Sequence, residues 1–390
     1  MENRNSNNPS LRLVLAALLT AAPLAAADDR PAGVIRFAAF NAALSGETAD
    51  DLPRRLATPD DEQLQKVAAI IQHVRPDVLL INEFDHDPTG RLAALFQTHY
   101  LGVAQADAPP ITFAHTRSPP VNTGLPTGLD LDGDGRTDGP GDAHGWGAYP
   151  GQFGMLLLSR LDAPLELVAS AQKTPWVNTR VSAFPESVLP AHARGIVRVS
   201  SKTHEAVRVA ERSGRSLYVL ISHPTPPVFD GPEDRNGWRN HAEIAMLVAM
   251  LRNVQRGLYP PFPPGPAVVL GDLNADPHDG ESRPLAIDQL RLDPRIRDPL
   301  PASRGAVAKA RADGGVNAEH RGDPALDTAD WPDEPGRGPG NLRVDYVLPT
   351  ADWTVVDAGV FWPEPGQAGH AWIDASDHRL VWADLALEAD

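Results

Sequence analysis

The chain has 390 residues, of which 42% are hydrophobic and 22% are charged, and this ordinary globular composition excludes a disordered or fibrous protein. It contains no cysteine, so an exported form would fold without disulfide bonds. The formal net charge of −16 opposes long-range attraction to a nucleic-acid backbone, although it does not exclude a phosphate substrate.

The N-terminus has the pattern of a secretory signal peptide over residues 1–27. Arginines precede an apolar run that begins at Leu13, and Ala25 and Ala27 have the spacing of an A-x-A cleavage site. The run is too short and too rich in alanine for a membrane span of ~20 residues. We therefore expect a secreted or periplasmic protein without stable membrane association, with one domain over residues 28–390.

The rest of the chain alternates between apolar runs and turn-rich segments. Eight runs are typical of strands: 33–41, 77–84, 153–160, 193–201, 216–223, 266–274, 344–350 and 378–385. A first helix is expected to begin at Thr58-Pro59 and end before Pro76, and a second to begin near Asn240. The apolar face of the first comprises Leu64, Val67, Ala68, Ile71 and Val74, and that of the second comprises Ile244, Leu247, Val248, Leu251 and Val254. Because strands and helices do not alternate strictly, the pattern favours an α/β or α+β sandwich, with long loops at 104–150, 224–239 and 301–341.

Polar side chains stand where several of these strands end. In "VVLGDLNADP" the two-residue period of a strand places Asp272 and Asn274 on one face, although the same letters are also typical of a turn. Similar residues mark the ends of other strands: Asn41, Glu83, His223, Asp345, Asp377 and His378. Carboxylate and amide oxygens are the ligands that Mg²⁺ or Mn²⁺ prefers, and a neighbouring carboxylate orients an imidazole.

This ordered set resembles the endonuclease/exonuclease/phosphatase superfamily, which includes deoxyribonuclease I. The matching pieces are Asn41, "INEFD", "SH", "GDLN", "RVDYV" and "SDH". The resemblance implies a four-layered α/β sandwich of two packed mixed sheets flanked by helices, and it makes residues 28–390 one catalytic domain. It implies that Glu83, Asn41 and Asp377 hold the catalytic metal. It further implies that Asp272 orients or deprotonates the attacking water, Asn274 and His223 contact the phosphate, and His378, paired with Asp345, stabilises charge on the phosphoryl group.

An acidic stretch, "DLDGDGRTDGPGD", has the spacing of a calcium-binding loop. Asp130, Asp132, Asp134 and Asp138 occupy its first, third, fifth and ninth positions, and Gly135 its sixth. The twelfth position is Gly141 rather than glutamate, with an acid one residue later. We favour a structural Ca²⁺ site over an acidic turn.

Further polar residues near the strand ends are candidates for binding substrate phosphate: Arg194, Arg235, Arg239 and Asn240. An equally favoured alternative is that these side chains only lie at the surface near the start of a helix and bind no substrate. Tyr149 and Gln152 lie where the family has residues near its metal, but a packing role is favoured for both.

Together these observations predict an exported phosphoesterase that depends on a divalent metal and cleaves phosphodiesters, nucleic acid among them, by in-line attack of activated water. Two alternatives stay open. One is a phosphomonoesterase for a small phosphorylated metabolite, and the other is a non-catalytic, calcium-ordered binding protein on the same scaffold. No protein partner is indicated.

Overall fold

The computed structural model describes residues 30–178, 185–186, 188–253, 262 and 264–388. The predicted signal peptide lies outside this range. Among the described residues, no helix combines the length and the apolar character needed to cross a bilayer.

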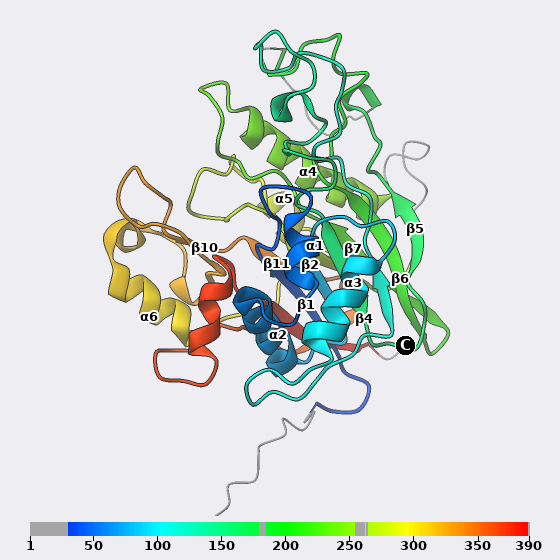
Figure 1. Ribbon diagram of the computed structural model, residues 1–390, viewed down its shortest axis with the longest axis vertical. Helices are drawn as coiled ribbons and strands as arrows, with labels where there is room; N and C mark the ends of the chain where they lie inside the picture. Colours follow the sequence, from blue (N-terminus) through cyan, green and yellow to red (C-terminus); the bar gives the residue numbers. More distant parts are fainter. Residues whose placement is uncertain (1–29, 179–184, 187, 254–261, 263, 389–390) are drawn as a thin grey trace, which may run out of the picture.

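Two mixed β-sheets form the centre of the molecule (Figure 1). The first has the order β12 (Trp353–Val360), β13 (Val381–Leu387), β1 (Ile35–Asn41), β2 (Val78–Asn82), β4 (Met155–Ser159) and β3 (His115–Arg117). The second has the order β11 (Asp345–Pro349), β8 (Ala267–Asp272), β7 (Arg215–Ser222), β6 (His204–Arg212) and β5 (Glu166–Ser170). The pairs β1–β2 and β7–β8 are parallel, and their other neighbours are antiparallel.

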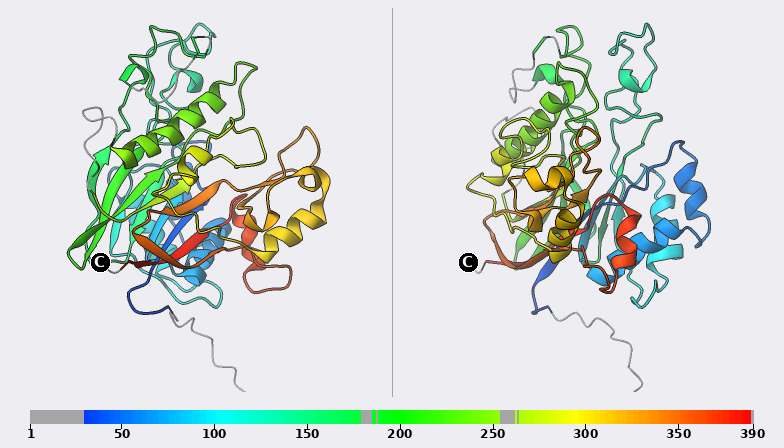
Figure 2. Two further views of the ribbon diagram at one scale, coloured as in Figure 1. Left: turned by 180° about the vertical axis from the view of Figure 1, so that it is seen from behind. Right: turned by 90° about the vertical axis from the view of Figure 1, so that its left-hand side faces the viewer.

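The sheets pack face to face, and helices cover their outer faces. Along β1, Phe37 and Ala39 enter the core between the sheets, whereas Ala38 and Phe40 face the helices, as the two-residue period requires. The outer layers are α1 (Asp51–Leu56), α2 (Glu62–Val74) and α3 (Arg91–Phe96) on the first sheet, and α4 (Arg235–Arg252) and α5 (Asp288–Arg291) on the second. The right-hand view of Figure 2 shows these four layers edge-on, which confirms the predicted sandwich.

Both predicted helices are present, but each begins at a different residue from the one expected. The N-cap of α2 is Asp61, whose side chain accepts a hydrogen bond from the backbone N of Leu64, so Thr58-Pro59 lies before the helix. Helix α4 begins at Arg235 rather than near Asn240. The predicted apolar face of α2 is buried. In α4, Ile244 and Leu247 are buried, Val248 and Leu251 are half-buried, and Val254 lies outside the described residues.

One predicted strand was wrong. Residues 193–201 form turns, and the strand in this part of the chain begins at His204. The apolar alternation there reflects Val197 and Val199, which are buried in the cluster beneath α4. The sequence reading also missed β3, β5, β6 and β12. The stretch 301–341 is not a plain loop, because it contains α6 (Arg304–Asp313) and the short sheet of β9 (Ala329–Asp330) and β10 (Asn341–Leu342).

Candidate active site

The registers of the two sheets bring the polar strand ends to one edge of the sandwich. Asn41 is level with Asn82 in the parallel pair β1–β2, and Asp345 is level with Asp272 in the antiparallel pair β11–β8. His223 follows the last residue of β7, beside β8. Parallel strands carry their C-terminal residues to the same edge, so side chains from distant parts of the sequence meet there.

The backbone at this edge has a close approach between two strands and two non-glycine residues with positive φ. A Cβ atom at Gly271 would lie 2.0 Å from the carbonyl oxygen of Ser222, so only glycine allows β7 and β8 to approach this closely. The residues that follow the strands adopt positive φ, +60° at Glu83 and +51° at Asn274. Such conformations cost ~1 kcal/mol or more in a non-glycine residue and cluster at functional sites.

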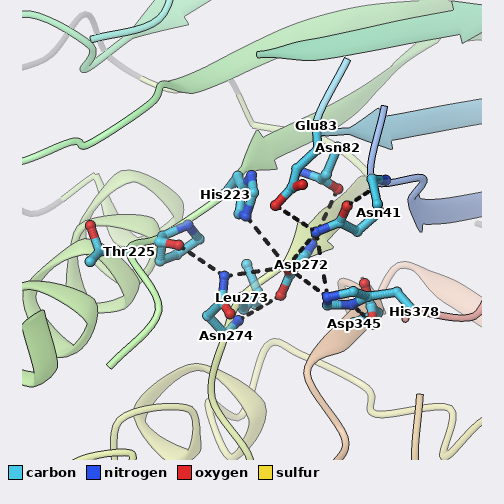
Figure 3. A network of polar contacts seen from close by, with 12 residues as sticks. Asn41, Asn82, Glu83, His223, Thr225, Asp272, Leu273, Asn274, Asp345 and His378 are labelled. Carbon is cyan, nitrogen blue, oxygen red and sulfur yellow. Dashed lines mark hydrogen bonds and ion pairs between the residues drawn. The ribbon is translucent and has the colours of Figure 1, made fainter. Parts of the chain in front are cut away.

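Asp272 is the centre of the polar network in Figure 3. Its Oδ2 accepts hydrogen bonds from the Nδ2 atoms of Asn41 at 3.0 Å and Asn274 at 3.2 Å, and it lies 3.4 Å from Nε2 of His223. Burial alone would raise the pKa of this carboxyl, but the charge on His378 and the bonds from His223 and Asn41 outweigh burial and hold the pKa below its ordinary value. Asp272 is therefore an ionised, oriented carboxylate.

His378 is held on the other side of Asp272 by a second carboxylate. Its Nδ1 lies 2.9 Å from Oδ2 of Asp345, and its Nε2 lies 3.8 Å from Oδ2 of Asp272. Burial opposes the charged imidazolium, but the charges of Asp345 and Asp272 prevail and raise the pKa of His378 to about 10. Burial raises the pKa of Asp345 to about 6 despite the nearby imidazolium. At neutral pH the proton therefore lies on His378.

Glu83 and Asn41 form the third part of the site. The Nδ2 atom of Asn41 donates to Oε1 of Glu83 at 3.2 Å as well as to Asp272, so the two carboxylates converge on one point. Glu83 is half-buried, whereas Asn41 and Asp272 are buried. Two convergent carboxylates and an amide suit a hard divalent cation, and Glu83, Asp272 and Asn41 are the residues that would hold it. Ligation by Asn41 would need its amide to turn, because its Oδ1 now accepts a hydrogen bond from the backbone N of Ala43.

Two predicted phosphate contacts, His223 and Asn274, are also in this network. Burial and the charge of Lys202 lower the pKa of His223, so its imidazole is neutral. Its Nδ1 is buried and has no hydrogen-bond partner among the described residues, whereas its Nε2 faces Asp272. The amide of Asn274 donates to Asp272 and to the carbonyl oxygen of Pro224, so it positions Asp272.

Asp377 is not part of the Glu83–Asn41 group. It is exposed, and its Oδ2 accepts a hydrogen bond from Nε1 of Trp331 at 2.7 Å. The Trp331 ring in turn meets His378 edge-on, with centroids 5.2 Å apart. Asp377 therefore holds an aromatic side chain over the imidazole, a different placement from the metal ligation that the family resemblance implies.

The candidate phosphate ligands on and near α4 lie elsewhere. Arg239 is buried, and its guanidinium donates to the backbone carbonyls of His144, Arg198 and Val199. Asn240 likewise donates to three backbone carbonyls, those of Thr225, Leu273 and Asn274. Both side chains anchor loops, so the structural alternative describes them better than phosphate binding.

Arg194 and Arg235 also contact backbone carbonyls. Nε of Arg194 donates to the carbonyl oxygen of Leu189 at 3.0 Å, and Nη1 of Arg235 donates to that of Leu131 at 3.4 Å. Arg235 therefore reaches the acidic loop, and burial lowers the pKa of its guanidinium. No contact in the described structure brings either arginine to Asp272.

The acidic loop keeps three of its four predicted ligands together. Ligand atoms of Asp130, Asp132 and Asp134 all lie within 4.8 Å of one another, and all three residues are exposed. Asp138 pairs instead with Arg136 at 2.9 Å. Asp142, one place beyond the twelfth position, is buried and accepts hydrogen bonds from the backbone N atoms of Leu131 and Gly139.

Four residues of the site were not singled out from the sequence. Thr328 donates to Asp345 at 2.8 Å, Asn82 accepts from the backbone N of Asp272 at 3.3 Å, and Ser376 donates to the carbonyl oxygen of Asn41 at 2.8 Å. Trp331 is the fourth. Asn82 and Ser376 lie within the matching pieces "INEFD" and "SDH", whereas Thr328 and Trp331 carried no such signal.

Comparisons with known proteins identify the family of this chain. The model of the Endonuclease/Exonuclease/phosphatase family matches residues 38–378. An endonuclease/exonuclease/phosphatase from Beutenbergia cavernae DSM 12333 is similar at 19% identity with a TM-score of 0.50, over 91% of this chain and 72% of that one. The catalytic domain of human Nocturnin, solved with a bound sulfate anion, is 16% identical with a TM-score of 0.47, over 91% and 95%. Truncated TDP2 from Caenorhabditis elegans is 13% identical with a TM-score of 0.43, over 90% and 97%. A search of curated proteins gave no match.

Proposed function

The chain belongs to the endonuclease/exonuclease/phosphatase family, and from this premise we propose that it is an exported, divalent-metal-dependent phosphodiesterase. The observation that carries the proposal is the position of Asp272, an ionised carboxylate between a neutral His223 and a protonated His378, with Glu83 beside it. Hydrolysis of a phosphate ester needs an oriented water and positive charge for the phosphoryl oxygens, and this site offers groups for both tasks.

Each side chain has a distinct task in the proposed reaction. Asp272 accepts a hydrogen bond from the attacking water; because its pKa is held low it is a weak base, so it orients the water more than it deprotonates it. His378 donates from Nε2 to a phosphoryl oxygen, while Asp345 fixes the orientation of its ring. His223 contacts the phosphate from the opposite side of Asp272.

The family uses divalent metals, and the Glu83–Asn41–Asp272 group fits Mg²⁺ or Mn²⁺ through its convergent oxygens. A bound cation would supply Lewis-acid stabilisation of the phosphoryl oxygens and lower the pKa of a water.

A diester is favoured over a monoester by the supply of positive charge. A monoester carries a charge of about −1.5 to −2 near neutrality, whereas a diester carries a single negative charge. The candidate arginines contact backbone carbonyls away from the site, so among the described residues the side-chain cations that act on Asp272, besides the proposed metal, are His378 and the buried Lys202. This balance suits a monoanion, nucleic acid included.

The deciding experiment is a hydrolysis panel with Mg²⁺, Mn²⁺ and Ca²⁺ in turn. It compares bis-p-nitrophenyl phosphate with p-nitrophenyl phosphate, and adds plasmid DNA, RNA, inositol phosphates and sphingomyelin. We expect the diester to be cleaved faster than the monoester with Mg²⁺ or Mn²⁺, and no turnover in excess chelator. If folded, metal-supplemented protein cleaves none of these esters, the non-catalytic binding protein becomes the better reading.

Two further parts of the proposal rest on the sequence. The proposal of export rests on residues 1–27. N-terminal sequencing of protein from the medium or periplasm tests it, and a mature chain that begins at Asp28 is the expected result.

The proposal of a structural Ca²⁺ in the acidic loop rests on the spacing of Asp130, Asp132 and Asp134, and thermal melting with calcium and with chelator tests it.

A further inference from the structure

A surface cavity of about 610 Å³ lies between the segment that follows β1, helix α1 and the segment that precedes β4. Its lining includes Ser45, Gly46, Trp146 and Phe153. None of the residues to which we assign hydrolysis or phosphate contact lines it. It is therefore a neighbouring compartment rather than the reaction centre itself.

The cavity is joined to the site by a fixed backbone contact. The hydroxyl of Ser45 donates to the carbonyl oxygen of Glu83 at 3.2 Å and accepts a hydrogen bond from the backbone N of Phe153 at 3.0 Å. The carbonyl oxygen of Gly46 accepts from the Tyr149 hydroxyl at 3.1 Å and from Nε2 of Gln152 at 2.8 Å. Four hydrogen bonds thus fix Ser45 and Gly46 against the backbone of Glu83 and the segment that precedes β4, and Tyr149 and Gln152 supply two of them.

Two aromatic rings form one side of this cavity. Trp146 is 60% exposed, which is unusual for so large a side chain, and its ring centroid lies 6.1 Å from that of Phe153 at an interplanar angle of 35°. Phe153 has φ of +53°, a conformation that a bulky residue adopts only where its surroundings impose it. The backbone therefore keeps an aromatic surface open towards the cavity.

The charges in the lining cancel. The lining contains two acidic residues, Glu47 and Asp51, and two arginines. Both arginines are paired, Arg54 with Asp51 at 2.6 Å and Arg55 with Asp61 at 2.8 Å. A second phosphate group would find no unpaired cation among these four residues. A flat, neutral ring would find an exposed indole on which to stack.

We propose that this cavity is a subsite for a neutral aromatic ring carried by the phosphate ester, either an aryl group bonded to the ester oxygen or a nucleobase on the sugar of a nucleotide, which stacks on Trp146. The proposal rests on the proposed function, because it places the ring of the ester beside the site where the ester is cleaved. It defines the substrate class more narrowly, as a phosphate ester that carries an aromatic ring.

Calorimetric titration tests the subsite without requiring turnover. Phenyl phosphate is compared with propyl phosphate, and AMP with ribose 5-phosphate, each in the presence of Mg²⁺. We expect the wild type to bind the aromatic member of at least one pair ~10-fold more tightly, which is the order of one stacking contact. The first pair reports an aryl source and the second a nucleobase source.

Variants separate stacking from folding. W146A should lose the aromatic preference and W146F should keep most of it. F229A is the matched control, since Phe229 is 90% exposed and does not line the cavity. Equal affinities within both pairs in the wild type, or a preference that survives in W146A, would overturn the subsite even if ester hydrolysis is observed. An aromatic preference lost in W146A, in a protein that cleaves no ester, would keep the subsite and reject the proposed hydrolysis.

Discussion

Two clusters of possible metal ligands in the described structure are similarly compact but have different surroundings. The first cluster is Asp272, Asp345 and His378, and the second is Asp130, Asp132 and Asp134. In each cluster the ligand atoms lie within 4.8 Å of one another. The first group is buried and the second is exposed. In the buried cluster the imidazolium of His378 supplies the countercharge. In the exposed loop the backbone supplies part of it: Asp130 accepts hydrogen bonds from the N atoms of Gly133 and Gly135.

This difference shows that carboxylate spacing does not by itself define a function. Burial removes water from the first cluster, so each charge there acts strongly on its neighbours. The raised pKa of His378 and the lowered pKa of Asp272 are the result. The exposed loop is open to solvent, and Arg235, which reaches its Leu131 carbonyl, forms no salt bridge with the three aspartates in the described structure. We therefore expect changes in the buried cluster to alter catalysis, and changes in the loop to alter stability alone.

The largest effect is expected from H378A. Removal of a preorganised donor to a developing oxyanion typically costs 10²–10³ in kcat, and the change also leaves Asp272 and Asp345 without their shared countercharge. We expect kcat on the best substrate of the panel to fall at least ~10²-fold, with KM changed far less. Steady-state kinetics measures this, and a melting curve confirms that the variant is folded. Unchanged kcat would remove His378 from the mechanism.

The second effect concerns calcium and the exposed loop. Ca²⁺ bound only to the folded protein stabilises it by about 2.7 kcal/mol at a concentration 100-fold above its Kd. We expect Tm to be higher in excess Ca²⁺ than in excess chelator, with Mg²⁺ restoring Tm poorly because it requires a tighter octahedral shell. Differential scanning calorimetry provides the measurement.

A double substitution, Asp132→Asn with Asp134→Asn, is the control for the loop. It should abolish the Ca²⁺-dependent part of Tm and leave kcat with Mg²⁺ within ~2-fold of the wild type, since neither residue contacts the buried cluster in the described structure. Identical wild-type Tm in calcium and in chelator would mean that the loop is an acidic turn.

A third and smaller effect is expected from T328V. Thr328 donates to Asp345 at 2.8 Å, and its hydroxyl also accepts hydrogen bonds from the backbone N atoms of Val344 and Asp345. Loss of this positioning should lower kcat ~10-fold, about 1.4 kcal/mol, while KM stays within ~2-fold. T328S keeps the hydroxyl and should recover most of the activity. If T328S is as impaired as T328V, the methyl group rather than the hydroxyl is what matters.

The central part of the site could be predicted because it depends on strand geometry. Asn41, Glu83, Asp272 and Asp345 stand at or next to the ends of regular strands, where the period of two and the sheet register fix which side chains meet. The sandwich followed from the same apolar runs. Neither inference required knowledge of how the loops fold.

The remaining contacts depend on loops and long-range packing, which local patterns do not encode. Thr328 and Trp331 reach the site through the β9–β10 sheet, and Ala329 forms an isolated bridge with His378, about 50 residues further along the chain. Arg239 looked like a phosphate ligand because it follows His223 in the sequence, yet its side chain is buried against three backbone carbonyls. Packing between segments that are distant in the sequence decides both cases.

Asp327 gives the smallest expected effect and tests whether burial, rather than carboxylate spacing, controls protonation. It is 7% exposed, and burial followed by the charges of Asp276 and Asp279 raises its pKa to about 8. Between about pH 4 and pH 8 the folded state therefore holds a proton that the unfolded state has released. This group makes the free energy of unfolding fall as pH rises through that window, and it has no further effect above it.

Asp327→Asn cannot titrate, and the free energy of unfolding of the variant relative to wild type should rise by ~1 kcal/mol or more from pH 5 to pH 8. Urea denaturation at both pH values measures the difference, with Asp107→Asn as the control, since Asp107 is exposed and is not among the carboxylates that act on Asp327. A D327N difference that is the same at pH 5 and pH 8 would mean that Asp327 is ionised in the folded protein, and burial would then not be what separates the two kinds of acidic cluster.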